Sequence, residues 1–416
     1  MPTRSVTGHI IAPPSKAQTH RAIFAALLAR GSTRIIHPLQ CDDTKATRRA
    51  VAALGAKITG STILTVSSKG TLKRPRGVID CGESGVTIRF AIPILSLIAD
   101  ETYLKAEERL IRRPIEPLAD ALEQLNVSLT IHNRMVTVNG GPAEGGSVTV
   151  RGDVSSQFIS GLLLAGTLMK KGLKLEVVSP LESRNYVLLT IEMMRRHGVK
   201  IKVNRNFSLF TVPKGQKPKP TTHEISGDFS SASYHLCAAA ITRSSLTVSN
   251  LSRTLEPDSV IVDFLSRMGV RVDVSRNRVV VEGSELRGAD LDIRECPDLG
   301  PIVAVLACYA DGTTRITGAR RLRYKESDRI ASIRSELTSL GGNVMEREDG
   351  LVLSGPATLT GGTVQSHNDH RIVMALSIAA LGARKGVSIK GAECVNKSYP
   401  GFFRDLRSIG VNVIGR

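Results

Sequence analysis

The sequence contains no tryptophan, and only 4% of its 416 residues are aromatic. Proteins that bind single-stranded nucleic acid stack bases on aromatic side chains, so this composition argues against that class of protein. Low-complexity tracts and long blocks of like charge are also missing, while 41% of the residues are hydrophobic and 23% are charged. This balance is typical of a folded protein, and the length allows two or more domains.

Cysteine is sparse and scattered. The six cysteines form no C-x-x-C pair and no cluster with histidine; they are Cys41, Cys81, Cys237, Cys296, Cys308 and Cys394. The spacing argues against a zinc site and a disulfide framework, and it is typical of buried thiols in a reducing compartment. We therefore expect no bound metal.

Long hydrophobic runs are missing too. The first residues, MPTRSVTGHIIAPPS, lack the apolar core of a signal peptide. The most apolar stretch, residues 90–99, contains Pro93 and is too short to span a membrane. These features predict a soluble, cytoplasmic protein.

Several catalytic motifs do not occur. The sequence has no G-x-x-x-x-G-K-[ST] phosphate loop, no G-x-S-x-G nucleophile turn and no evident Cys/His motif. The reaction, if there is one, is expected to need no nucleotide, no metal, no other cofactor and no covalent serine.

What the sequence does have is positive charge. Its 56 lysines and arginines against 38 aspartates and glutamates give a formal charge of +18. Such an excess favours an anionic partner: nucleic acid, an acidic membrane or small phosphorylated metabolites. The charge alone does not choose among them.

A helix-to-strand junction recurs six times along the chain. Each copy reads as an amphipathic helix, a glycine or asparagine, and then alternating apolar residues, as in IEMMRRHGVKIKV. The residues that end the helices are Gly55, Asn126, Gly198, Gly269, Gly341 and Gly410. A left-handed residue commonly ends a helix, and alternation predicts a strand with one buried face. The near-constant spacing indicates internal duplication, with three copies in each of two domains. The basic, proline-containing stretch of residues 214–220 is expected to be an exposed connection next to the domain boundary.

Cations are predicted at the N-termini of apolar helices. Lys16 and Arg21 stand at the start of one, Lys325 and Arg329 at another, and Arg371 at a third. A cation at a helix N-terminus is unfavourable by about 0.3–1 kcal/mol, because it opposes the helix dipole. Each cation taken singly is more typical of a solvated surface charge. A bound anion would reverse the unfavourable balance, so the recurrence of such cations predicts anion sites.

Two segments of similar sequence precede apolar helical runs. They are residues 152–157, GDVSSQ, and residues 227–232, GDFSSA. Serine or aspartate as a helix N-cap explains both. The first also carries Gln157, whose amide can donate to a phosphate or a carboxylate.

Eight segments in order resemble the 5-enolpyruvylshikimate-3-phosphate (EPSP) synthase family. They are PPSKAQTHRA, SGVTIRF, RRPIEPLADAL, GDVSSQF, SRNYV, KESDRI, NDHRIVMAL and NKSYPGFF. The resemblance covers the chain from Pro13 to Phe403, and KESDR followed by NDHR is its most specific part.

The resemblance implies a fold and a domain division. The family's fold is an α/β inside-out barrel of two domains, built from six βαβαββ repeats, three in each domain. By this resemblance residues 15–225 form the N-terminal globular domain. Residues 1–14 with 226–416 form the other, and two strands connect them as a hinge.

The resemblance also implies an activity. It is the transfer of the enolpyruvyl group of phosphoenolpyruvate to the 5-hydroxyl of shikimate 3-phosphate, with release of phosphate. This step belongs to the shikimate pathway of chorismate and aromatic amino acid biosynthesis, and it is the target of glyphosate. The implied partners are the two small-molecule substrates and neither nucleic acid nor a membrane, and we expect a monomer.

Site residues follow by motif match. Those implied for shikimate 3-phosphate are Lys16, Ala17, Arg21, Ser155, Ser156, Gln157, Ser183, Tyr186, Asp298, Arg321 and Lys325. Those implied for phosphoenolpyruvate are Lys16, Gly85, Arg113, Gln157, Arg329, Arg371 and Lys397. The many cations offset the repulsion between two phosphorylated carboxylates.

Two carboxylates match the catalytic pair. Asp298 is expected to be the base for the attacking hydroxyl and Glu326 the proton donor, with Lys16 as a relay. A simple ion pair of Glu326 with Lys325 or Arg329 is the alternative interpretation.

The sequence departs from the family pattern in places that bear on inhibitor sensitivity. Ala17 replaces a serine, Glu83 stands in an asparagine position, Asn185 replaces a proline, and Arg321 stands where many members have asparagine. Glu83 adds a negative charge close to the expected phosphoenolpyruvate site.

Two alternatives remain. UDP-N-acetylglucosamine enolpyruvyl transferase shares the fold, but the SSQ and KESDR segments match the shikimate enzyme better, and a catalytic-cysteine loop is not evident. A nucleic-acid-binding protein would explain the charge, yet it predicts aromatic–basic clusters or a known module, which the sequence lacks.

Overall fold

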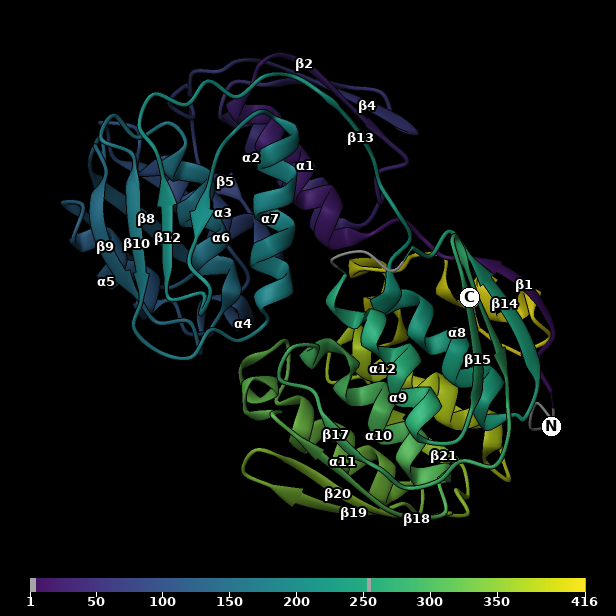
Figure 1. Ribbon diagram of the computed structural model, residues 1–416. Helices are drawn as coiled ribbons and strands as arrows, with labels where there is room; N and C mark the ends of the chain where they lie inside the picture. Colours follow the sequence, from purple (N-terminus) through teal and green to yellow (C-terminus); the bar gives the residue numbers. More distant parts are fainter. Residues whose placement is uncertain (1–4, 253–255, 416) are drawn as a thin grey trace. The chain divides into compact units, whose positions relative to one another are not determined.

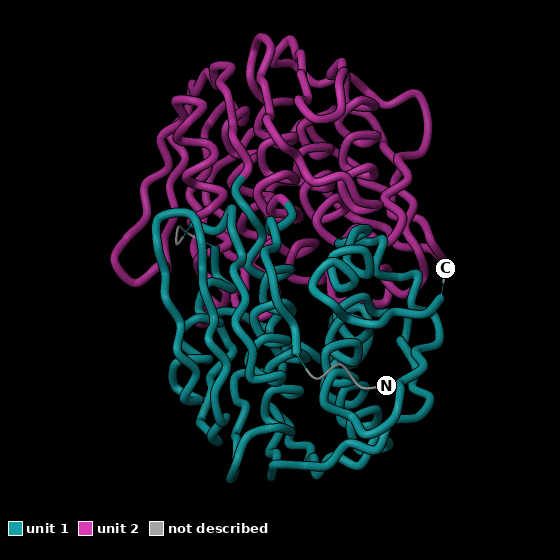
Figure 2. The backbone as a smooth tube through the Cα atoms, turned by 90° about the vertical axis from the view of Figure 1, so that its right-hand side faces the viewer, with its two compact units in different colours: residues 1–13, 226–416 teal, residues 14–225 magenta. Residues whose placement is uncertain are grey.

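The computed structural model describes residues 5–252 and 256–415. The chain divides into two compact units, coloured separately in Figure 2. Unit 1 comprises Met1–Pro13 and Ser226–Arg416, and unit 2 comprises Pro14–Ile225. The N-terminal strand therefore belongs to the same unit as the C-terminal half of the chain.

Unit 2 contains three four-stranded sheets (Figure 1). The first has the order β13-β2-β4-β3, with strands Thr222–Glu224, Arg30–Ile36, Ile63–Lys69 and Lys57–Thr59. The second is β5-β6-β8-β7, with strands Ile79–Asp80, Thr102–Lys105, Met135–Gly140 and Val127–His132. The third is β9-β10-β12-β11, with strands Gly146–Val150, Leu173–Val177, Leu209–Val212 and Lys202–Val203.

Unit 1 contains two sheets of the same size and one smaller sheet. They are β1-β14-β16-β15, with strands Gly8–Ile11, Ser245–Ser249, Arg278–Glu282 and Arg271–Ser275, and β17-β18-β20-β19, with strands Asp290–Asp292, Gly312–Thr317, Gly350–Gly355 and Asn343–Arg347. The third pairs β21 (Gly362–Gln365) with β22 (Val387–Lys390).

All five four-stranded sheets share one pairing pattern. The first strand runs parallel to the second, and the other two pairings are antiparallel, as in β17∥β18 followed by β20 and β19. The parallel partner comes from far along the chain in two cases, where β1 pairs with β14 and β13 pairs with β2. The fold is thus a mixed α/β fold with open, mixed sheets.

Helices pack against the sheets in both units. In unit 2 they are α1 (Lys16–Leu28), α2 (Asp42–Ala53), α3 (Gly85–Leu95), α4 (Glu108–Ile111), α5 (Glu116–Glu123), α6 (Ser156–Gly166) and α7 (Arg184–Arg196). In unit 1 they are α8 (Phe229–Ile241), α9 (Ile261–Arg267), α10 (Gly300–Tyr309), α11 (Arg329–Ser339), α12 (His370–Ala379) and α13 (Phe402–Ser408). Short 3₁₀ turns precede several of them: η1 (Pro257–Val260), η2 (Pro297–Leu299), η3 (Arg320–Tyr324) and η5 (Ala392–Lys397). A further 3₁₀ turn, η4 (Ala380–Gly382), directly follows α12.

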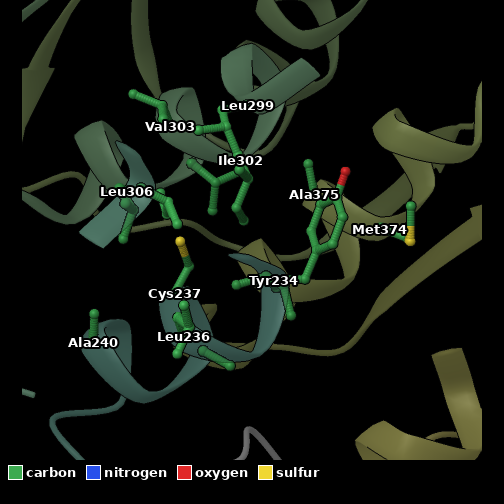
Figure 3. Close-up of a cluster of buried hydrophobic side chains, with 14 of the residues drawn as sticks. Tyr234, Leu236, Cys237, Ala240, Leu299, Ile302, Val303, Leu306, Met374 and Ala375 are labelled. Atoms are coloured by element: carbon green, nitrogen blue, oxygen red, sulfur yellow. The ribbon is translucent and has the colours of Figure 1, made fainter. Parts of the chain in front are cut away.

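The core of unit 1 lies where α8, α10 and α12 pack on one another. These helices are apolar on nearly all sides, as a fully surrounded helix must be. Figure 3 shows Cys237 of α8 beside Ile302 and Leu306 of α10, and all three side chains are buried. The close packing holds the helices rigidly, and so fixes where their N-termini lie.

The predicted helix ends are confirmed. Gly55, Asn126, Gly198, Gly269, Gly341 and Gly410 all have positive φ, from 59° at Asn126 to 109° at Gly55. The strand expected after each of them is not always present. Only Lys202–Val203 of the third copy forms a strand, and residues 411–415 form none. There the backbone oxygens of Val413 and Gly415 instead accept hydrogen bonds from Arg407.

Two further findings concern the described residues. None of their helices is long and apolar enough to cross a membrane. All six cysteines are free thiols, five of them buried and Cys394 partly buried, as expected from their spacing.

Candidate active site

In unit 1 a partly buried network of charges centres on Asp298. This residue lies in η2, directly before α10. Its Oδ2 accepts a hydrogen bond from Arg371 Nη2 at 2.8 Å, and its Oδ1 accepts one from Arg329 Nη1 at 2.9 Å. Lys325 Nζ lies 3.5 Å from the same Oδ1. One carboxylate therefore meets three cations from two segments of the chain.

Helix caps explain why these cations converge. Asp328 is the N-cap of α11 and accepts from Ala331 N, and Asp369 is the N-cap of α12 and accepts from Arg371 N. Each cap fixes the first turn of its helix, which is where Arg329 and Arg371 stand. The sequence prediction that these two arginines open apolar helices is confirmed.

Arg329 is the most constrained of the cations, with a side chain 1% exposed. Its Nε donates to Asp369 Oδ2 at 2.8 Å and its Nη2 to Asp369 Oδ1 at 3.2 Å. Nη2 also donates to Glu326 Oε2 at 2.7 Å. Glu326 therefore does form an ion pair with Arg329, as the alternative interpretation held. It also lies near a second cation, with its Oε1 3.6 Å from Lys397 Nζ.

The charges set one another's protonation. Burial raises the pKa of Asp298, but attraction by Arg371, Lys325 and Arg329 outweighs it and holds the pKa well below its usual value. Burial lowers the pKa of Arg329, but attraction by Asp369, Glu326 and Asp298 outweighs burial and raises that pKa above its usual value. Asp298 is therefore ionised at neutral pH and surrounded by permanent positive charge.

Arg321 lies at the edge of this network. It sits in η3, is 8% exposed, and donates from Nη2 to the backbone oxygen of Arg294 at 2.7 Å. In unit 1, ion pairs thus bring together Asp298, Lys325, Glu326, Arg329, Arg371 and Lys397.

In unit 2 the first helix carries three expected site residues, Lys16, Ala17 and Arg21. Lys16 is the first residue of α1, and its Nζ lies 3.0 Å from Asp43 Oδ2 on α2. Arg21, one turn later, is 2% exposed and donates from Nε to Thr190 Oγ1 at 2.8 Å and from Nη2 to the Tyr186 oxygen at 3.0 Å. Its guanidinium also lies over the Tyr186 ring, 5.6 Å from the centroid. Arg21 therefore ties α1 to the start of α7.

A second group forms at the start of α3. A Cβ atom added to Gly85, the first helical residue, would lie 3.2 Å from Arg113 Nη1 and 3.5 Å from Arg89 Nη1. Arg89 Nη1 donates to Gln157 Oε1 on α6 at 3.0 Å. The missing side chain of Gly85 thus lets two guanidinium groups approach the helix N-terminus closely.

The serines expected near the starts of α6 and α7 differ in backbone conformation. Ser155 is the N-cap of α6 and accepts from Gln157 N at 3.3 Å, as the motif predicted, and Ser156 is the first helical residue. Ser183, directly before α7, is 2% exposed and has φ of 55°. A non-glycine residue in this left-handed region is uncommon and is often found at functional sites.

Sequence reasoning missed two residues that hold the expected ones. Asp43 pairs with Lys16, and Asp369 binds Arg329. Only Asp369 left a recognisable signal, because an aspartate two residues before the arginine in NDHR fits an N-cap. Among the described residues, no group of three or more His, Cys, Asp or Glu side chains is arranged to hold a metal ion.

Comparisons with known proteins agree on one family. A model of the EPSP synthase (3-phosphoshikimate 1-carboxyvinyltransferase) family matches residues 1–406. A 3-phosphoshikimate 1-carboxyvinyltransferase of Methanocorpusculum labreanum is 40% identical over 415 residues, which is 98% of this chain and 97% of the relative. The protein of that name from Methanocaldococcus jannaschii is 36% identical over 420 residues, 99% and 97% of the two chains.

The chain belongs to the EPSP synthase family. The solved structure of EPSP synthase from Acinetobacter baumannii agrees, with a TM-score of 0.83 at 27% identity, covering 98% of this chain and 96% of that one. The family resemblance drawn from KESDR and NDHR is therefore confirmed.

Proposed function

We propose that this chain transfers the enolpyruvyl group of phosphoenolpyruvate to the 5-hydroxyl of shikimate 3-phosphate and releases phosphate. The observation that carries the proposal is a partly buried carboxylate, Asp298, held by three convergent cations in a member of the EPSP synthase family. Two anionic substrates need such a concentration of positive charge. The net charge of +18 is accounted for by these substrates and requires neither nucleic acid nor a membrane.

The two units supply different parts of the two binding sites. Unit 2 contributes residues to shikimate 3-phosphate through the starts of α1, α6 and α7, which carry Lys16, Ala17, Arg21, Ser155, Ser156, Gln157, Ser183 and Tyr186. Unit 1 adds Asp298, Arg321 and Lys325 to the same ligand. Free backbone N–H groups and hydroxyls at helix N-termini suit a phosphate.

Phosphoenolpyruvate takes cations from both units as well. Arg329, Arg371 and Lys397 come from unit 1, and Lys16, Gly85, Arg113 and Gln157 come from unit 2. Arginine binds carboxylate and phosphate through two parallel hydrogen bonds, which suits a ligand carrying both groups. Since both ligands need both units, the connecting strands act as a hinge that brings the units together on the substrates.

Asp298 acts as the base and Glu326 as the proton donor. The 5-hydroxyl gives its proton to Asp298 as its oxygen attacks phosphoenolpyruvate, and Glu326 gives a proton to the methylene carbon, with Lys16 as a relay. Loss of phosphate and return of that proton restore the double bond. Phosphoenolpyruvate competes with Asp298 for Arg329 and Arg371, so its binding weakens their hold and raises the pKa of Asp298 toward that of a working base.

The finer architecture and the setting of the protein follow the same family. We take the six sheets as six βαβαββ repeats of an inside-out α/β barrel, three to each domain, supported by the shared pairing pattern of five sheets. The two-stranded sheet is then a shortened sixth copy. A monomer in the cytoplasm fits free, buried thiols and small-molecule substrates.

Phosphate release tests the proposal. The purified protein is incubated with phosphoenolpyruvate and shikimate 3-phosphate together, with each alone, and with UDP-N-acetylglucosamine as the alternative acceptor. We expect release only with phosphoenolpyruvate and shikimate 3-phosphate together. Release with UDP-N-acetylglucosamine instead would assign the chain to the other transferase, and release from phosphoenolpyruvate alone would refute transfer.

A further inference from the structure

Helix α11 carries a buried carboxylate, Glu336, that has no role in the proposed reaction. Glu336 stands seven residues after Arg329, two turns along the same helix face. Its side chain is 9% exposed. Oε2 accepts the backbone N–H of Gln365 at 2.9 Å, and Oε1 lies 2.7 Å from His367 Nε2. Both oxygens therefore bind the segment that leads from β21 into α12.

That segment has an unusual backbone. His367 and Asn368 both have positive φ, 52° and 54°. Histidine and asparagine tolerate this left-handed region better than most residues, but two in succession still cost on the order of 1–3 kcal/mol each. Such a conformation persists only where surrounding contacts fix it. Glu336 is one source of those contacts. Another is Ser366, which accepts from Asn368 N through Oγ at 3.1 Å and donates from its own N to the Lys390 oxygen at 3.0 Å.

The segment ends directly at the candidate site. The next residue is Asp369, which is fully buried, binds Arg329 through two hydrogen bonds and caps α12 at Arg371. A shift of the 365–368 backbone would move Asp369, and with it both guanidinium groups. Glu336 is thus connected to Arg329 and Arg371 indirectly, through residues 365–369 and through α11.

We infer that Glu336 is a positioning residue, which sets Asp369, Arg329 and Arg371 by holding Gln365 and His367 in place. It acts without touching a substrate. The inference rests on the proposed function, because that assigns Arg329 and Arg371 to phosphoenolpyruvate. A purely structural Glu336, which only satisfies a buried N–H group, would contribute to stability and nothing more.

Two substitutions separate these roles. Glu336→Gln keeps an oxygen for Gln365 N but removes the charge that faces His367. His367→Asn removes the contact with Glu336 while keeping a residue that tolerates positive φ, and its site is 33% exposed, so the variant should fold. Glu282→Gln is the control, because Glu282 pairs with Arg271 on the exposed surface of the same unit.

The readout is the split between the two KM values. For Glu336→Gln and His367→Asn we expect the KM for phosphoenolpyruvate to rise about tenfold, the effect of roughly one hydrogen bond to a charged group, and that for shikimate 3-phosphate to stay within about twofold. The double variant should add little to either single one, because both remove the same contact. Glu282→Gln should change neither value.

Other outcomes overturn the inference. Both KM values rising together, or a lower melting temperature with unchanged kinetics, would make Glu336 a structural residue. If the wild-type protein shows no turnover, the proposed function fails by itself, and the inference is then decided by calorimetric affinity for phosphoenolpyruvate. An affinity that Glu336→Gln leaves unchanged, or no binding by wild type, contradicts it.

Discussion

Arg371 and Asp298, 73 residues apart in sequence, meet through a 2.8 Å hydrogen bond between Nη2 and Oδ2. The expected base is thus bound to a cation expected to hold phosphoenolpyruvate. In the proposed function, phosphoenolpyruvate and Asp298 compete for the same guanidinium. This competition gives Asp298→Asn an unusual expected phenotype.

Asp298→Asn should lower kcat by roughly 10²–10⁴, because the base is lost. The KM for phosphoenolpyruvate should stay unchanged or fall, because Arg371 and Arg329 no longer have to exchange a carboxylate for the substrate. Steady-state kinetics in both substrates measures this, with Asp290→Asn, at an exposed surface pair with Arg315, as the control. A large rise in that KM would mean that Asp298 positions the arginines instead of competing for them.

Glu326→Gln should lower kcat by roughly 10²–10⁴ and change either KM far less, because general acid catalysis is lost while the amide can still accept from Arg329. Glu348→Gln, on a side chain 82% exposed, serves as the matched control. A kcat within about threefold of wild type is a far smaller loss than that expected when a general acid is removed, and it would show that Glu326 is not the proton donor.

Ala17→Ser should lower the KM for shikimate 3-phosphate several-fold and leave that for phosphoenolpyruvate nearly unchanged. Ala17 follows Lys16 in the first turn of α1, and its backbone oxygen already accepts from Arg21 Nη1 at 3.0 Å. A new hydroxyl there can add a hydrogen bond to a charged group, about 1.5–3 kcal/mol, reduced where water already supplies one. If the two KM values move together, Ala17 does not line the phosphate site.

A buried histidine pair should make unit 2 sensitive to acid. His223 Nε2 lies 2.9 Å from His197 Nε2, and burial, with the nearby His197 and Arg196, lowers the pKa of His223 to about 3. In the unfolded chain its pKa is about 6.5. Below about pH 6.5 His223 is protonated in the unfolded chain but stays neutral in the folded protein. The free energy of unfolding therefore falls as the pH drops from about 6.5 toward about 3.

Urea unfolding at pH 7, 6 and 5 measures this effect. His223 should contribute a loss of about 1.4 kcal/mol per pH unit below about 6.5, which His223→Gln removes. His9→Gln, at an exposed histidine of β1, is the control. Equal slopes for wild type and His223→Gln would show that His223 titrates normally in the folded protein.

The sequence predicted what depends on local pattern. Caps at Ser155 and Asp228, cations opening α11 and α12, and left-handed helix ends are set by neighbours a few residues away. The motifs also named Asp298, Arg329 and Arg371, which the structure brings into contact.

What the sequence could not predict depends on long-range contacts. The pairing of Lys16 with Asp43, or of Glu336 with His367, joins segments 27 and 31 residues apart, and no local pattern marks either carboxylate. The prediction of a strand after Gly410 was wrong for a related reason. A strand needs a partner, and there the backbone oxygens of Val413 and Gly415 accept from Arg407 instead.

The most direct test of the central claim is the NMR spectrum of the product formed from ¹³C-labelled phosphoenolpyruvate and shikimate 3-phosphate. Transfer predicts an enol ether on the 5-oxygen of shikimate 3-phosphate and an equal amount of inorganic phosphate. Phosphate with labelled pyruvate and no ether, or an ether that forms only on UDP-N-acetylglucosamine, would contradict it.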